Sequence, residues 1–556
     1  MGVPSLYRTL VSHYSTIQDV STEQTEYLFL DFNCLIHHCL RVVKGMDISM
    51  REMEEEVITE ILRYAIYIIT KVVKPTRLVY ISIDGPVPVA KMERQRSRRF
   101  KKIQDAAFAQ KTRRKYNMDE EKSFDSNRVT PGTMFMSKLN SRIKNYITIG
   151  AFATHAKRSL RVVFSDSNVP GEGEYKIFEY IRNCKTQPKI HIYGMDADLI
   201  MLSMAVNRPH IRLMREASTI DMTTDAEFSY LDVDVCKKAL YDDYISDEMK
   251  SSLSIDAFIR DFILYSKMGG NDFVHPLPHC KMRTGGLEKL TRVYVIVYSL
   301  LHKPLVSPEG DINPLFMKHF LSRLSESEDL GMKRSSGYRN TPQEQLTYER
   351  EIEMYEHSEY SNPRNPFHLF YKDTLQEVDF KKGYDEWVKE YNAHFFKDIN
   401  LADVTKEYFK SLIWSYKYYH GDMSSWTYYY PYRTSPSIKT IVEYFDPSYL
   451  VATFDKDVVL SPFEQLLYVL PAQSCRLLPY GLQDMMTDSE SPIADYYPSR
   501  FKLDVIAGGK NIYSEALLPH IHIPYIRCAV ANVPLNDHEV MRNTIVEQPF
   551  HKTCNV

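Results

Sequence analysis

The chain lacks several features that would assign it to a common class of protein. Its eight cysteines contain no CxxC pair, so the sequence predicts neither a disulfide framework nor a zinc ribbon. The longest strongly apolar runs, AIYII and VYVIVYSLL, fall far short of the roughly 20 residues of a membrane-spanning helix. GxxxxGK[ST], HExxH and GxSxG are all absent. These absences favour an intracellular protein that is not a P-loop enzyme, a zincin or a serine hydrolase.

The chain also lacks a large excess of positive or negative charge. The chain has 69 basic and 72 acidic residues and a net charge of −3. Any attraction to nucleic acid must therefore come from a local patch rather than from the field of the whole protein.

A repeated pattern runs from Tyr27 to about Leu202, in which a short β-rich run is followed by an acidic turn and a helix. Further predicted strands are Leu78 to Ile83, Arg161 to Phe164 and Lys189 to Tyr193. This alternation predicts an α/β fold with a mostly parallel twisted sheet flanked by helices.

The length of 556 residues predicts more than one domain. We place a first domain at residues 1–324, a polar variable insertion or linker at 325–378, and a second, aromatic-rich region at 379–556. Within the first domain, the helical pattern IDAFIRDFILYSKMGG ends at a glycine pair that leads into Asn271 and Asp272.

Acidic residues follow four of the β-rich runs, in YLFLDFN, LVYISIDG, VVFSDSNVPGEGE and IHIYGMDADL. Since the carboxyl ends of parallel strands meet at one crevice, we expect these side chains to converge and to hold divalent metals. Any single one could instead be a surface acid or a helix N-cap. Hard oxygen ligands suit Mg²⁺ or Mn²⁺, and two such ions about 3.5 to 4 Å apart support phosphodiester hydrolysis. The candidates are Asp31, Asp84, Glu172, Glu174, Asp196, Asp198 and Asp272.

A basic helix is predicted at KMERQRSRRFKK. At 100° per residue, Lys91, Gln95, Arg98 and Arg99 fall within one stripe about 100° wide. Such a stripe can surround a doubly charged 5′-monophosphate better than an internal diester. The alternatives are a solvated basic face or a nonspecific nucleic-acid patch.

These motifs resemble the Xrn family of 5′-to-3′ exoribonucleases, which belongs to the same superfamily as the flap endonucleases. MGVPSLYRTL, LDFNCLIHHC, SIDGPVPVAKMERQRSRRF, TPGTMFM, VVFSDSNVPGEGEYKIFEYIR, YGMDADLIMLS and GGNDFVHPLP follow the family's first block in order. YYYPYRTSPS, PFEQLLYVLP and MMTDSESPIADYYP resemble its second block. The resemblance implies a flap-endonuclease or PIN-like nuclease core capped by a largely helical second region.

The resemblance also implies roles for residues. The seven carboxylates correspond to the family's metal site, with two Mg²⁺ or Mn²⁺ ions expected, and Lys91, Gln95, Arg98 and Arg99 correspond to its 5′-phosphate pocket. His37 aligns with a histidine that stacks on the first base, with Trp426 as the opposing ring and Tyr428 as a substitute for it. Base stacking is sequence-tolerant because every base has a π-face.

The implied function is processive 5′-to-3′ hydrolysis of single-stranded, 5′-monophosphorylated RNA to nucleoside 5′-monophosphates in RNA decay. We expect a cytoplasmic rather than nuclear location and a decapping enzyme as a partner. The alternatives are a flap-type DNA nuclease and a non-catalytic RNA-binding protein.

The sequence departs from the family pattern at two places. Cys34 replaces the glycine usual in its motif, and VHPLP changes the order of proline and histidine after GNDF. The end at Val556 suggests a compact member, of viral or protist source.

Overall fold

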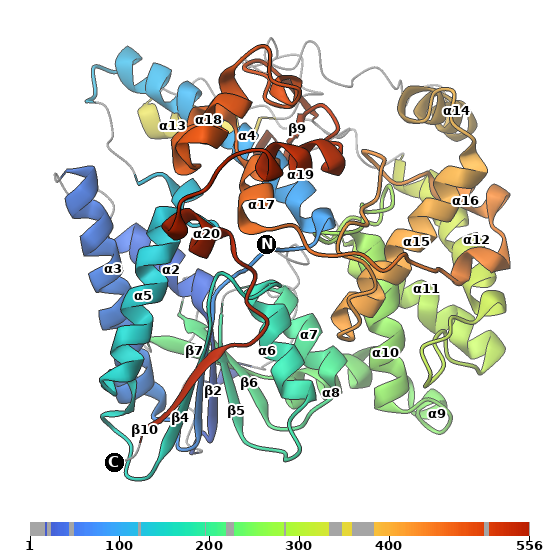
Figure 1. Cartoon of the computed structure of the whole chain (residues 1–556). Helices are drawn as coiled ribbons and strands as arrows, with labels where there is room; N and C mark the ends of the chain where they lie inside the picture. The colour runs from blue at the N-terminus through green and yellow to red at the C-terminus, as the bar shows by residue number, and fades with distance from the viewer. Residues whose placement is uncertain are drawn as a thin grey trace.

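A computed structural model gives the fold (Figure 1). It describes residues 17–18, 24–43, 49–119, 124–194, 196–217, 227–282, 285–332, 347–358, 383–504 and 511–554. The segment MGVPSLYRTL and most of the predicted linker 325–378 lie outside these ranges. Within them, every helix is too short or too polar to cross a bilayer.

The central element is a sheet with strand order β1-β7-β6-β5-β2-β3-β4-β10. The strands from β6 to β4 are all parallel, whereas β7, β1 and β10 pair antiparallel at the edges. The prediction of a mostly parallel sheet is therefore confirmed. The strands are β1 (Ile17–Gln18), β2 (Tyr27–Asp31), β3 (Leu78–Ser82), β4 (Leu160–Ser165), β5 (Ile190–Tyr193), β6 (Ile211–Glu216), β7 (Phe228–Asp232) and β10 (Phe550–Cys554).

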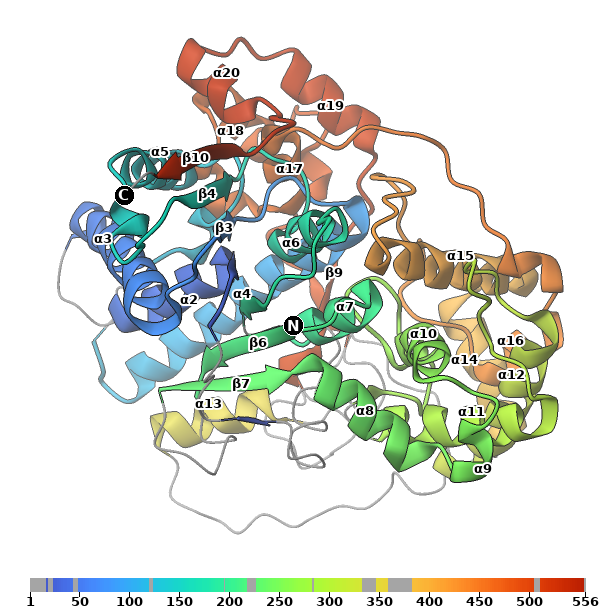
Figure 2. The ribbon, with the colours of Figure 1, turned by 90° about the horizontal axis from the view of Figure 1, so that it is seen from below.

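Both faces of the sheet are covered because alternate strand residues point to opposite sides. Phe29 of β2 packs in one core and its neighbours Leu28 and Leu30 pack in another. One face carries α2 (Phe32–Val43), α3 (Met50–Tyr67) and α5 (Met134–Thr148). The other carries α6 (Gly173–Arg182), α7 (Asp198–Val206), α8 (Val233–Tyr244) and α10 (Ile255–Ser266), as Figure 2 shows from below.

The rest of the described chain is mostly helical. A group beside α10 consists of α9 (Asp247–Lys250), α11 (Gly286–Leu301), α12 (Pro314–Met332), α14 (Tyr384–Phe395), α15 (Leu401–Tyr419) and α16 (Ile438–Tyr444). Helix α15 carries buried aromatic side chains into the same core as α6, α7 and α10. The second region therefore packs directly on the helices that follow the strands.

A third core joins helix α4 to the last third of the chain. It contains Val89, Met92 and Phe100 of α4 (Val89–Lys115), together with buried residues such as Leu466 from the last third of the chain. Its other elements are α17 (Pro462–Val469), α18 (Tyr480–Thr487), α19 (Ile523–Ala531) and a two-stranded sheet of β8 (Lys502–Asp504) and β9 (Glu515–Leu517). The short helices α13 (Tyr348–Glu356) and α20 (Asp537–Asn543) pack at its edge.

Candidate active site

The predicted acidic residues lie where the parallel strands end. Asp31 is the last residue of β2, and the strands on either side of β2 are β3 and β5. Asp84 follows β3 and Asp196 follows β5, while Glu172 lies in the loop between β4 and α6. The strand order thus brings residues separated by more than 160 positions to one edge of the sheet.

Short backbone contacts hold two of these loops together. Gly85 N donates to Gly171 O at 2.9 Å, and Gly171 N donates to Pro86 O at 2.8 Å. A Cβ on Gly85 would lie 1.7 Å from the carbonyl oxygen of Val169, so the close approach requires glycine there. The loop that carries Asp84 is therefore fixed against the loop that carries Glu172.

Asp84 itself is oriented from both sides. Asn33 Nδ2 donates to its Oδ2 at 2.7 Å, and the backbone N–H of Gly173 donates to its Oδ1 at 2.6 Å. Asp31 accepts a hydrogen bond from Cys34 Sγ at 2.9 Å. Cys34, which stands where the resemblance implies a glycine, therefore contacts a candidate metal ligand through its side chain.

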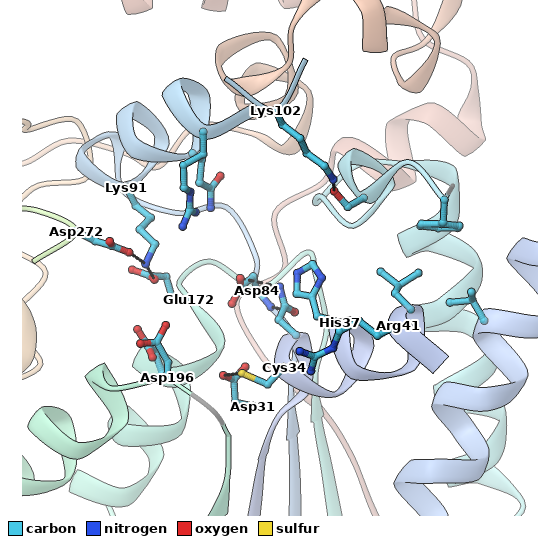
Figure 3. Close-up of a pocket in the computed structure, with 18 of the residues that line it drawn as sticks. Asp31, Cys34, His37, Arg41, Asp84, Lys91, Lys102, Glu172, Asp196 and Asp272 are labelled. Atoms are coloured by element: carbon cyan, nitrogen blue, oxygen red, sulfur yellow. Dashed lines mark hydrogen bonds and ion pairs between the residues drawn. The ribbon is translucent and has the colours of Figure 1, made fainter. Parts of the chain in front are cut away.

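Six of the seven candidate carboxylates line one cavity of about 850 Å³ (Figure 3). The exception, Asp198, is almost fully buried just behind it, and its backbone N–H donates to Asp196 Oδ1 at 3.2 Å. The cavity also contains predicted basic residues, so the two chemistries share one space. The carboxylates that line it are Asp31, Asp84, Glu172, Glu174, Asp196 and Asp272.

Negative charge is concentrated in this cavity. Burial, together with the charges of Asp84 and Asp196, raises the pKa of Asp31 to about 7. Burial and the charge of Asp196 likewise raise the pKa of Asp198 to about 7. Burial and its acidic neighbours raise the pKa of Glu174 well above its usual value. Without a compensating cation, these carboxyl groups retain protons at a pH at which exposed ones are ionised.

Lys91 lies between the carboxylates and the rest of the basic stripe. Its Nζ is 2.5 Å from Glu172 Oε2 and 2.7 Å from Asp272 Oδ2. Burial would lower the pKa of Lys91, but the charges of Asp272 and Glu172 outweigh burial and raise it well above the usual value. Lys91 is thus a protonated side chain at the boundary between the carboxylates and the basic stripe.

The basic stripe on α4 faces the cavity through Lys91, Gln95, Arg98 and Lys102. Gln95 Oε1 is buried and has no hydrogen-bond partner among the described residues. Lys102 was not predicted, although it lies only 20° from Lys91 around the helix, so the same periodicity could have found it. Arg99 is placed differently, because its Nη1 donates to Thr130 Oγ1 at 2.8 Å and it does not line the cavity.

The two predicted stacking residues are not placed as a pair. His37 lines the cavity, where burial and the charges of Lys102 and Arg41 lower its pKa, although Asp84 acts in the opposite direction. Trp426 is partly buried in a turn and does not line the cavity.

The turn that holds Trp426 is fixed near the start of α4. The Trp426 N–H donates to Asp457 Oδ1 at 2.6 Å, and the Trp426 carbonyl accepts from Val89 N at 2.8 Å. Tyr428 packs edge-on against Phe454. The roles of these rings in base stacking remain predictions.

The chemistry of the carboxylates fits divalent cations. Seven acidic side chains meet at one edge. Burial, together with the charges of neighbouring carboxylates, raises the pKa of Asp31, Glu174 and Asp198, and a bound cation favours their ionised form. As placed, no three His, Cys, Asp or Glu side chains of the described ranges form a ready metal-holding group. Lys91 occupies the space between Glu172 and Asp272, so ion binding there requires the ammonium to move.

Two family models match the chain. Residues 1–217 match the XRN 5′-3′ exonuclease N-terminus, and residues 370–553 match the Xrn1 helical domain. The sheet and the helical region give the fold class of a PIN-like nuclease core with a second, helical domain.

The chain belongs to the XRN 5′-3′ exonuclease family. It is 29% identical to 5′-3′ exoribonuclease 1 of Homo sapiens, with 95% of this chain and 33% of that protein aligned. Identity is 27% to 5′-3′ exoribonuclease 1 of Schizosaccharomyces pombe, over 95% of this chain and 48% of that protein. The identity to 5′-3′ exoribonuclease 1 of Saccharomyces cerevisiae is 26%, over 93% of this chain and 42% of that protein. The chain thus spans between a third and a half of the length of these relatives.

Proposed function

We propose that the protein is a metal-dependent 5′-to-3′ exoribonuclease that acts on single-stranded RNA with a 5′-monophosphate and releases nucleoside 5′-monophosphates. The observation that carries the proposal is the single cavity, in which six carboxylates lie beside four residues of a basic helix stripe. Family membership and the names of the relatives, 5′-3′ exoribonucleases, support the same reaction.

The carboxylates would hold two ions, Mg²⁺ or Mn²⁺. When bound, such ions supply an activated water and neutralise charge on the leaving oxygen. Asp31, Asp84 and Glu172 come from three separate strand ends, so the sheet itself fixes their spacing. Asn33 and the Gly173 N–H keep Asp84 oriented for this task.

The basic stripe would bind the 5′-phosphate. Lys91, Arg98 and Lys102 supply cationic donors on one helix face, and Gln95 adds a neutral amide. A terminal monophosphate carries more charge than an internal diester and is a smaller group than a cap, so this pocket selects for it. Each cut would create a new 5′-phosphate for the same pocket, which gives processive degradation.

Processing of capped RNA requires a prior reaction that exposes a 5′-monophosphate. We therefore propose that the protein acts in RNA decay after a decapping enzyme, in the cytoplasm. Fractionation of cells that express the tagged protein, with RNA decay measured before and after decapping, tests this placement.

The central test compares RNA of one sequence with a 5′-monophosphate, a 5′-hydroxyl or a cap. We expect only the first to decay to mononucleotides, only with Mg²⁺ or Mn²⁺, and not with Asp196→Ala. Arg98→Ala removes a charge-assisted phosphate contact and should raise KM for 5′-monophosphorylated RNA by about tenfold. Lys111→Ala, an exposed lysine on the same helix outside the cavity, is the matched control. Equal decay of all three RNAs would refute the pocket.

A further inference from the structure

One face of α15 contacts three of the loops that carry the candidate metal ligands. Tyr418 and Tyr419 lie three and four residues after Ser415, so the three side chains share one helix face. Tyr418 OH donates to Glu172 Oε1 at 2.7 Å, and Tyr419 OH donates to Asp198 Oδ1 at 2.7 Å. Ser415 Oγ accepts from the side-chain amide of Asn271, next to Asp272, at 3.1 Å.

Both tyrosines are held rigidly. Each is about 1% exposed. The ring of Tyr418 stacks on Trp414 with centroids 5.4 Å apart and contacts Phe273 at 4.9 Å. The hydroxyl groups therefore cannot turn to water, and the two carboxylates are their partners within a buried environment.

The buried side chain of Lys267 lies against the second tyrosine. Lys267 Nζ is 3.0 Å from the centroid of the Tyr419 ring, and it has no hydrogen-bond partner among the described residues. Lys267 is 1% exposed. Burial lowers the pKa of Lys267 well below its usual value. Lys267 thus packs against the ring of Tyr419 and helps to hold it beside Asp198.

We propose that Tyr418 and Tyr419 are positioning residues that hold Glu172 and Asp198 ready for ion binding. Like charges at this edge would otherwise turn the carboxylates apart, whereas a neutral donor fixes one oxygen of each without adding charge. The proposal rests on the proposed function and adds that the helical region, through α15, controls whether the metal site is assembled.

The test measures ion binding without RNA. Isothermal titration of the full chain with Mn²⁺ compares wild type, Tyr418→Phe and Tyr419→Phe. We expect at least about tenfold weaker binding in both variants, since loss of a hydrogen bond to a ligating carboxylate commonly has this effect. With RNA, their kcat should recover at high Mg²⁺, while the half-saturating Mg²⁺ concentration rises.

Tyr408→Phe is the matched control. Tyr408 lies on the same helix, is fully buried, and its hydroxyl has no hydrogen-bond partner in the described part of the chain. Tyr408→Phe should bind Mn²⁺ as the wild type does, and all three variants should keep melting temperatures close to the wild type. Unchanged Mn²⁺ binding in Tyr418→Phe and Tyr419→Phe would overturn the positioning role. A wild type that binds no Mn²⁺ would instead overturn the proposed metal-dependent function.

Discussion

At the scale of single residues, the candidate carboxylates destabilise the fold when they are ionised, and bound cations remove this destabilisation. Asp31, Asp198 and Glu174 all have raised pKa values, with burial as the largest cause. In the unfolded chain these groups ionise near pH 4. Between about pH 4 and pH 7 the folded protein therefore holds protons that the unfolded chain has lost. Such groups stabilise the fold at low pH, and this contribution disappears as the pH rises.

This imbalance predicts a pH dependence for the metal-free protein. Its free energy of unfolding should fall between about pH 5 and pH 7, and the fall should be smaller in Asp31→Asn, which cannot ionise. Mg²⁺ should reduce the fall in the wild type because it binds the ionised carboxylates. Denaturant unfolding in EDTA and in Mg²⁺, at four or five pH values, measures the difference. Identical slopes for wild type and Asp31→Asn would contradict the assignment of the raised pKa.

Sequence alone could identify much of this site. Six of the carboxylates were predictable because they follow β-rich runs, and Asp272 because it follows the end of a predicted helix. The stripe on α4 was predictable because helical periodicity is local. The partners of the carboxylates were not predictable in the same way. Tyr418 lies 246 positions from Glu172, and the aromatic run around it reads as an ordinary packed core. Arg99 shares the stripe with Arg98, yet Thr130 holds its guanidinium away from the cavity.

At the scale of elements, the candidate site depends on the loops that follow β3 and β4, whose backbones are in direct contact. Gly85→Ala should force Val169 and the following loop away, since its Cβ would lie 1.7 Å from a carbonyl oxygen. Overpacking of this kind typically costs about 1–3 kcal/mol, and here it also separates Asp84 from Glu172. We expect a lower melting temperature together with loss of Mn²⁺ binding in calorimetry.

Gly310→Ala is the control that separates backbone strain from crowding by an added Cβ. Gly310 has a φ of +97° and nothing within 4 Å of an added Cβ, so alanine there strains only a remote turn. That variant should lose some stability and still bind Mn²⁺. If Gly85→Ala binds Mn²⁺ as Gly310→Ala does, the close approach of the loops is not needed for the site.

The elements also show where prediction from sequence ends. Strands β3, β4 and β5 appear within a residue or two of their predicted ends, because short β-rich runs with flanking turns are a local signal. The pairing of β10 with β4 joins residues almost 400 positions apart and has no such signal. The same is true of the α15 face, whose contacts exist only after the chain has folded.

At the scale of the whole molecule, the two regions that match the family are joined by shared cores. Met92 and Phe100 of α4 pack with Leu466 of α17, and β10 completes the sheet beside β4. The helix that presents the basic stripe is thus supported on its other side by the last third of the chain. We infer that the sheet and this third core unfold together.

Leu466→Ala tests that coupling. Leu466 is fully buried, and loss of such a side chain costs about 2–5 kcal/mol. Hydrogen exchange should accelerate in α17 and equally in β4, because the cost is shared by one cooperative unit. Val388→Ala is the matched control, since Val388 belongs to a separate small cluster around Trp387 and Tyr391. Its effect should stay within α14 and its neighbours. Faster exchange confined to α17 in Leu466→Ala would show instead that the third core opens independently of the sheet.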